Sequence, residues 1–330
     1  GFSARLPAVA EHFTVHEAPS ACTRRAERVA LEHTWLASRT RGFDLVHHGG
    51  GTVPRRGNPR TLLTVHDVQW VDYPGYVRAV KLRYLRWMVP RSLERATRIA
   101  VPSSFVAGTL ESAFGTPRTR IGVVRHGLEA AFDEPAAAAD VRARFNIGNR
   151  PFVVYPAITH PHKNHAFLLE LMAAAGTEWS DPGLVAVFAG SQGHADADVR
   201  ARIQRLGLGD RVVMPGRVSP SDRNGLLAAS DAMVFPSEYE GFGAPLIEAM
   251  RTGTPVIASD RASIPEVLGG CGIVRRLEPA AWAGALADAR RDRSVLVSAG
   301  RARAAEFTSA LSAEDLVAQY RMVVRSGDGS

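Results

Sequence analysis

The stretch Val234-Phe-Pro-Ser-Glu-Tyr-Glu-Gly-Phe-Gly-Ala-Pro-Leu-Ile-Glu248 decides the fold of this chain. It predicts a buried strand from Ala232 to Phe235, a glycine loop, and a helix that begins at Pro245, since proline is favoured at the first helical position. Gly241 and Gly243 have no Cβ, so the loop backbone can approach a ligand closely. The free N–H groups at the start of such a helix form a site that suits a phosphate.

Two carboxylates flank this predicted phosphate site, Glu240 in the loop and Glu248 in the first turns of the helix. A carboxylate repels a phosphate, so we expect both glutamates to accept hydrogen bonds from hydroxyl groups. A ligand with phosphates in its middle and hydroxyls at both ends is a nucleotide sugar. The alternative is a capped strand–turn–helix with two solvated glutamates, and a G-x-G pattern alone does not separate the two interpretations.

The longer stretch PSEYEGFGAPLIEAMRTGTPVIAS, residues 236–259, places seven residues between the two glutamates. It resembles the Glu-x7-Glu signature of the retaining family 4 glycosyltransferases of GT-B fold, and the similarity continues through 263–267 and 269–272. The resemblance implies an α/β protein with two facing Rossmann-like, doubly wound domains. The C-terminal domain would hold the donor, a nucleoside-diphosphate sugar that acts as co-substrate in place of any cofactor, and the N-terminal domain would hold the acceptor.

Alternating strands and helices along the chain also predict parallel α/β sheets. The segment Asn146–Pro151 is the predicted boundary, which gives an acceptor domain over 1–148, a donor domain over 149–310, and a C-terminal helix over 311–330 that in the family returns to the first domain. The predicted strands are Phe13–His16, Phe43–His47, Thr61–His66, Arg98–Val101, Ile121–Val124, Phe152–Tyr155, Leu184–Ala189, Val212–Met214, Ala232–Phe235, Pro255–Ala258 and Gly272–Val274. The main predicted helices are Arg24–Ser38, Val77–Thr97, 104–114, His165–Ala175, Ala197–Leu206, Ser219–Ala229, a helix from Pro245, and Ala313–Val324.

The family opens with a strand, a glycine-rich loop and a helix, and Gly1 lies beyond all three. We therefore expect the N-terminal domain to lack its first strand and helix, which leaves an interior edge of its sheet unpaired. Three functions remain open: an active transferase, a truncated protein that binds donor without activity, and a GT-B epimerase or phosphorylase. The Glu-x7-Glu stretch argues against the last of these.

Ligands of open α/β sheets bind outside the carboxyl ends of the strands. Lys163 follows the first strand of the second domain and matches the family lysine that neutralises the donor diphosphate. A fixed cation at that place stabilises the charge that develops on the leaving group. Many family members also carry an arginine six residues earlier, where this chain has Ala157. We therefore expect neutralisation to depend on Lys163, on the helix N-terminus and on Arg217.

His66 and Asp67 end a buried strand and match the His-Asp pair on the acceptor side of the family cleft. His66 would hydrogen-bond the transferred sugar or its acceptor; the alternative is a loop histidine satisfied by its neighbours. Together with the glutamates, the resemblance implies three sets of residues. The catalytic candidates are Glu240, Lys163 and His66; the donor-binding candidates are Glu248, Gly241, Phe242, Gly243, Ala244, Gly190, Ser191, Arg217 and Asn164; and the acceptor-side candidates are Gly49, Gly50, Asp67 and His126.

The histidines His160, His162 and His165 form an H-x-H-x-x-H cluster that could suggest a metal. No cysteine or acidic residue accompanies them locally, and GT-B enzymes usually work without a bound metal, so we expect no metal site. Glu266 has two open roles, a cap for the helix after Pro265 or a contact to the ribose.

Charge is unevenly distributed, with +9 over residues 1–150 and −2 over the remainder. This basic half suits an anionic acceptor or an anionic lipid surface, although an arginine-rich composition alone gives the same excess. The basic helix from Val80 to Arg98 either lies on lipid or is an ordinary surface helix. The two cysteines, Cys22 and Cys271, form no disulfide framework and indicate a reducing cytoplasm.

The expected protein is cytoplasmic, with peripheral contact at the inner face of the membrane. Its expected partners are a nucleotide-sugar donor and a glycan or lipid-linked acceptor, and we expect no nucleic acid. The overall pattern resembles bacterial mannosyltransferases of polysaccharide or envelope assembly, which implies GDP-mannose as donor.

Overall fold

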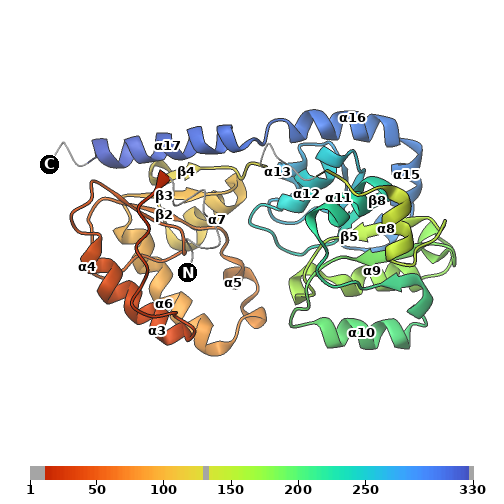
Figure 1. Cartoon of the computed structure of the whole chain (residues 1–330), viewed down its shortest axis with the longest axis horizontal. Helices are drawn as coiled ribbons and strands as arrows, with labels where there is room; N and C mark the ends of the chain where they lie inside the picture. The colour runs from red at the N-terminus through yellow and green to blue at the C-terminus, as the bar shows by residue number, and fades with distance from the viewer. Residues whose placement is uncertain (1–11, 129–133, 327–330) are drawn as a thin grey trace.

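The computed structural model describes residues 12–128 and 134–326, which form two α/β domains connected side by side (Figure 1). The first domain holds a four-stranded sheet in the order β1-β2-β3-β4, and the second holds a six-stranded sheet in the order β10-β9-β8-β5-β6-β7. All pairs in both sheets are parallel. In the second sheet the direction of winding reverses between β5 and β8, the place where ligands of doubly wound sheets bind.

Helices and strands alternate in the first domain as the sequence predicts. Its strands are β1 (Val46–His48), β2 (Thr61–Thr64), β3 (Arg98–Val101) and β4 (Ile121–Val123). Its helices include α3 (Arg25–Leu31), the π-helical turn η1 (Glu32–Leu36), α4 (Ala37–Arg39), α5 (Gln69–Asp72), η2 (Pro74–Tyr76), α6 (Ala79–Arg95) and α7 (Ser104–Phe114).

The second domain repeats the pattern over a larger core. Its strands are β5 (Phe152–Tyr155), β6 (Val185–Phe188), β7 (Val212–Val213), β8 (Ala232–Phe235), β9 (Val256–Ser259) and β10 (Ile273–Arg275). Its main helices are α8 (Ala138–Arg144), η4 (Pro161–Lys163), α9 (His165–Ala173), α10 (Asp196–Arg205), α11 (Pro220–Ala229), α12 (Ala244–Thr252), α13 (Ile264–Leu268), α14 (Pro279–Trp282), α15 (Ala285–Arg291) and α16 (Arg293–Ala304).

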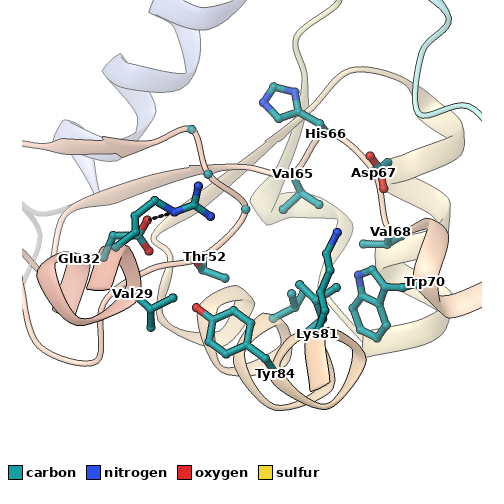
Figure 2. A pocket seen from close by; sticks show the side chains of 16 residues that line it. Val29, Glu32, Thr52, Val65, His66, Asp67, Val68, Trp70, Lys81 and Tyr84 are labelled. Carbon is teal, nitrogen blue, oxygen red and sulfur yellow. Dashed lines mark ion pairs between the residues drawn. The ribbon is translucent and has the colours of Figure 1, made fainter. Parts of the chain in front are cut away.

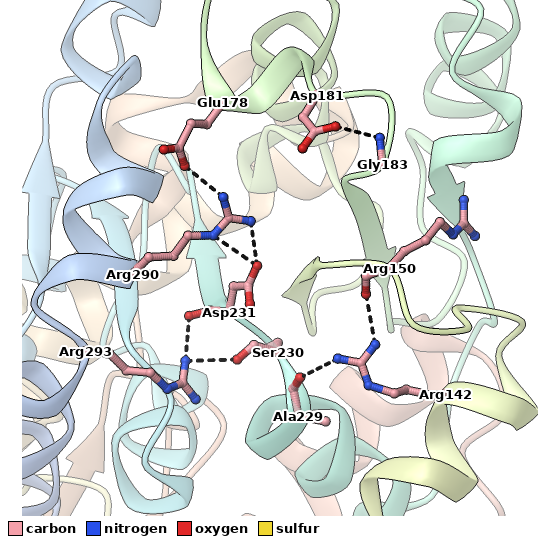
Figure 3. Close-up of polar contacts among 10 residues, drawn as sticks. All are labelled: Arg142, Arg150, Glu178, Asp181, Gly183, Ala229, Ser230, Asp231, Arg290 and Arg293. Carbon is pink, nitrogen blue, oxygen red and sulfur yellow. Dashed lines mark hydrogen bonds and ion pairs between the residues drawn. The ribbon is translucent and has the colours of Figure 1, made fainter.

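The central strands β5, β6, β8 and β9 are buried along their whole length, which explains their continuous apolar sequences. At the amino end of β8, arginines hold the backbone in place (Figure 3). Arg290 pairs with Asp231 at 2.7 Å, and Arg293 donates to the Asp231 carbonyl at 2.9 Å. These contacts fix the amino end of the sheet, so the carboxyl ends are the ones left for a site.

The C-terminal helix α17 (Ser309–Arg325) runs along the first domain (Figure 1). Val323 packs with Leu62 and Ala100 beneath it, and the Tyr320 hydroxyl lies 2.8 Å from His47 Nδ1. The two connections between the domains lie side by side, because the Leu128 N–H donates to the carbonyl of Phe307 at 2.9 Å. The chain therefore links its domains twice at one place.

Most predicted elements are confirmed within one to three residues at each end, the C-terminal helix begins four residues before its predicted start, and one predicted strand is wrong. Residues 13–16 form no strand. The strand predicted at Phe43–His47 begins only at Val46, and Phe43 is 58% exposed in the preceding turn, where its carbonyl accepts a hydrogen bond from Asn58. β1 therefore lacks the burial on both faces that its sequence suggested, and among the described residues it pairs only with β2. Within residues 12–128 and 134–326, no helix has the length and apolar character needed to cross a bilayer.

Candidate active site

The glycine loop between β8 and α12 lies against the first domain. A Cβ on Gly241 would stand 2.1 Å from the carbonyl oxygen of His66, so only glycine fits there. Gly243 precedes α12 with φ 94°, a left-handed conformation, and no side chain caps that helix start. Ala244 and Pro245 follow as its first residues. Pro245 has no N–H, and the Leu246 N–H donates to the Gly243 carbonyl at 2.9 Å, so among these first three residues the Ala244 N–H is the donor that can meet a ligand.

Lys163 and Glu240 form the central ion pair of the site. Their Nζ and Oε1 atoms are 2.5 Å apart, and their side chains are only 15% and 11% exposed. They meet because β5 and β8 are neighbours, so the loops at their carboxyl ends lie together. The Tyr155 hydroxyl donates to the Lys163 carbonyl at 2.7 Å and lies 2.9 Å from Ser237 Oγ. The pair is therefore held by well-anchored backbone.

Glu248 lies farther along α12 and pairs with Arg223 of α11 at 3.1 Å. Burial raises the pKa of Glu248 above its ordinary value, and the charge of Arg223 opposes that shift. Arg223 was not predicted, because it lies on α11 outside any motif. A mostly buried carboxylate beside an arginine can accept hydrogen bonds from hydroxyl groups.

Three rings meet where the two domains touch. The rings of His66 and His126 stack with centroids 5.6 Å apart, and His126 lies edge-on to Phe242 at 5.0 Å. Burial lowers the pKa of His126, and the proximity of His66 lowers it further. His126 is consequently neutral at physiological pH and can donate or accept a hydrogen bond. The structure thus brings two acceptor-side histidines to the donor-side glycine loop.

A cavity of about 490 Å³ opens beside His66 in the first domain (Figure 2). Gly49, Gly50, His66 and Asp67 line it, so four of the predicted catalytic and acceptor-side residues share one cavity. Apolar side chains, among them those of Val65, Val68 and Trp70, form part of its wall, and Lys81 reaches into it from α6. The Asp67 carboxylate accepts the Gln69 N–H at 3.2 Å.

Of the remaining residues predicted on the donor side, three lie in or beside the loops that follow β5 and β6, and one lies apart from them. A Cβ on Gly190 would meet the Ala157 carbonyl at 1.9 Å, so this glycine lets the loops after β5 and β6 pack together, and the Ser191 carbonyl accepts the Thr159 N–H at 3.3 Å. The Asn164 side chain caps α9 by accepting the Phe167 N–H. Arg217 lies exposed between β7 and α11 and forms no ion pair within the described residues. Arg217 is thus not held in the cluster around Lys163.

The three clustered histidines point in different directions. His160 stacks against His162 and against His194, whereas His165 packs between Tyr155 and Phe188 in the core. Burial, followed by the charge of Lys163, lowers the pKa of His162 to about 3. Burial lowers the pKa of His165 to about 4. No group of three or more His, Cys, Asp or Glu side chains within 12–128 and 134–326 is arranged to hold a metal ion.

Ser263 and Glu266 make further contacts around the loop, one within the second domain and one with the first. The fully buried Ser263 places its hydroxyl 2.9 Å from the Glu240 carbonyl and 3.1 Å from that of Phe242. Glu266 contacts the other domain, where its carboxylate accepts the backbone N–H groups of Ser104 and Phe105 at 2.8 and 3.0 Å. This role differs from both of those left open by the sequence.

Two family models match the chain, one to each domain. The model for Glycosyl transferases group 1 matches residues 139–294, and the model for Glycosyltransferase Family 4 matches residues 4–132. The group 1 match begins ten residues before the predicted donor domain and includes α8, whose Val141 packs in the core of the second domain.

Individual proteins are similar over much of the chain. The O-antigen chain mannosyltransferase B of Escherichia coli is 28% identical over 70% of this chain and 61% of its own length. The MMP α-(1→4)-mannosyltransferase of Mycolicibacterium hassiacum is 29% identical over 93% of this chain and 75% of its own length. The chain thus spans about three fifths to three quarters of these relatives. The Anabaena protein HepE, solved with UDP-glucose, superposes with a TM-score of 0.72 at 19% identity, covering 99% of this chain and 89% of HepE, which confirms the GT-B fold.

Proposed function

We propose that the chain transfers a hexose from a nucleoside-diphosphate sugar to a hydroxyl acceptor with retention of configuration. The chain belongs to the glycosyltransferases of family 4 type with the GT-B fold. The observation that carries this proposal is the Lys163–Glu240 pair beside the uncapped start of α12, with Glu248 farther along the same helix. A cation and the Ala244 N–H suit a diphosphate, and the two carboxylates suit the hydroxyls at the two ends of a nucleotide sugar.

In the proposed reaction, Lys163 and the start of α12 with its Ala244 N–H stabilise the charge that grows as the diphosphate leaves the anomeric carbon. Lys163 is paired with Glu240 in the structure, so donor binding exchanges one anion for another at its Nζ. Glu240 then accepts hydrogen bonds from the sugar ring, and Glu248 from the ribose. Retention follows if the leaving phosphate takes the proton of the acceptor hydroxyl on the face from which it departs.

The acceptor, a glycan or a lipid-linked sugar, would occupy the cavity beside His66 and Asp67 (Figure 2). Access from an anionic membrane is part of the proposal, because α6 exposes 83% of Val80 and 43% of Trp87, and the Arg91 guanidinium lies 5.1 Å from the Trp87 ring centroid. The names of the two curated relatives support mannose as the transferred sugar. We place the reaction in polysaccharide or envelope assembly at the inner face of the membrane.

The test is to incubate the chain with GDP-mannose and with UDP-glucose and to follow the release of nucleoside diphosphate. We expect release with one of these donors, faster with an added sugar acceptor, and a product whose anomeric proton in the NMR spectrum keeps the donor configuration. Inverted product would contradict the retaining step. Binding of donor without release in any condition would favour the alternative, a donor-binding protein without activity.

A further inference from the structure

The first domain contacts the glycine loop at the two residues that precede Glu240. The Tyr73 hydroxyl donates to the carbonyl of Glu238 at 3.3 Å, and the Tyr76 hydroxyl donates to its carboxylate at 2.8 Å. Tyr239 is buried, and its hydroxyl accepts the N–H of Val68 at 3.4 Å. The two residues before Glu240 are therefore fixed by groups from α5, η2 and their flanking turns.

The first domain also contacts the residue that follows Glu240, through the start of α7. The Ser103 hydroxyl donates to the carbonyl of Gly241 at 2.6 Å. The Glu266 carboxylate crosses the interface in the opposite direction and caps α7 at Ser104 and Phe105. A carboxylate at a helix N-terminus meets both free N–H groups and the positive end of the helix dipole. The two contacts thus join the start of α7 to the glycine loop and to α13 of the second domain.

Glu240 lies between these two sets of contacts, and its own domain holds it through Ser263 and Lys163. If the domains separate, the loop keeps its bonds to His162 and Ser263 but loses those to Tyr73, Tyr76, Val68 and Ser103, while the uncapped helix start and Glu248 belong entirely to the second domain. Nucleotide binding and the placement of Glu240 should for that reason depend on different contacts.

We propose that Ser103 and Glu266 are positioning residues for the proposed transfer, because they hold the start of α7 against the glycine loop and against α13, and so complete the placement of Glu240 when the two domains are closed. The effect on transfer rests on the proposed function, whereas the contacts that hold the two domains together do not depend on it. Closing of this kind excludes water and completes the reactive arrangement in one step.

The experiment compares Glu266→Ala and Ser103→Ala with Ser112→Ala, a control that removes an exposed hydroxyl from the same helix α7. The measurements are turnover of GDP-mannose and UDP-glucose, calorimetric Kd of GDP and UDP, melting temperature, and radius of gyration from small-angle scattering. We expect both test variants to lower kcat at least tenfold, with nucleotide Kd within twofold of the parent. We expect Glu266→Ala to raise the radius of gyration, Glu266→Gln to restore part of kcat, and Ser112→Ala to match the parent.

Parental kcat in Glu266→Ala would overturn the proposal. A fall in nucleotide affinity and melting temperature that matches the fall in kcat would also overturn it, since that pattern belongs to residues that merely stabilise the fold. If the parent binds neither nucleotide, the proposed function fails. Scattering then still tests whether Ser103 and Glu266 hold the domains together: an unchanged radius of gyration in Glu266→Ala overturns this, and an increased one supports it.

Discussion

Lys163 and Glu240 neutralise each other in the structure, so each must leave the other before it can act on a donor. Lys163→Ala should therefore lower kcat more than it weakens donor binding, because the charge of Lys163 matters most as the diphosphate departs. Steady-state kinetics with the preferred nucleotide sugar measure this, with Lys163→Arg as the charge-conserving control. Normal kcat with a raised KM would instead assign Lys163 to uniform binding of substrate and transition state.

Glu248 is predicted to contact the ribose, and its removal also leaves Arg223 without its carboxylate partner. Glu248→Ala should weaken donor binding by about 1–3 kcal/mol, the range for hydrogen bonds to a charged acceptor. The raised pKa of Glu248 gives a second readout, because the carboxylate protonates at a pH above its ordinary value of 4.5. Parental affinity for donor should fall as pH drops through that raised pKa. Calorimetry that finds equal affinity in variant and parent would remove Glu248 from the site.

His165 gives a stability prediction that does not depend on function. Its pKa of about 4 in the folded state lies below the ordinary value of 6.5, so the unfolded chain takes up a proton first as pH falls. The free energy of unfolding should consequently decrease below pH 6.5, by about 1.4 kcal/mol per pH unit for this group, until pH approaches 4. Urea unfolding at pH 7 and pH 5 should show a smaller loss for His165→Leu than for the parent. Equal losses would place the titration elsewhere.

At the scale of elements, the sequence predicted those features whose causes are local. The starts of α12, of α7 and of α11 were predicted to within one residue, because the residues that favour a helix start adjoin the helix in the chain. Arg223 and Glu266 were not, since their partners lie far away in sequence on other elements. The strand predicted from Phe43 started too early, because the Phe43 carbonyl bonds to Asn58 and the residue lies in a turn.

The glycine loop provides a prediction at this scale. Gly241→Ala would place a methyl group against the His66 carbonyl, which is backbone and cannot move aside. We expect it to cost about 1–3 kcal/mol of stability through overpacking, or to hold the domains apart, and in both cases to lower turnover strongly. Gly209→Ala is the matched control, because a Cβ there has open space. Turnover and melting temperature equal to the parent would mean that the loop does not lie against the first domain.

The whole molecule joins its two α/β domains through two adjacent crossings and through α17, which packs on the first sheet. Parallel α/β order in each half follows from alternating apolar strands and helices and was predictable from the sequence. The closeness of the domains was not, because it depends on contacts such as Ser103 with Gly241 that no local pattern encodes.

The central claim is that the second domain binds a nucleoside-diphosphate sugar at the start of α12 beside Lys163 and Glu248. Calorimetric titration of the chain and of Glu248→Ala with GDP-mannose, UDP-glucose, ADP-glucose and dTDP-glucose tests it most directly. The account predicts saturable binding of at least one of the four, weakened in Glu248→Ala by about 1–3 kcal/mol. Absence of binding for all four by the parent chain, folded by its melting transition, would contradict it.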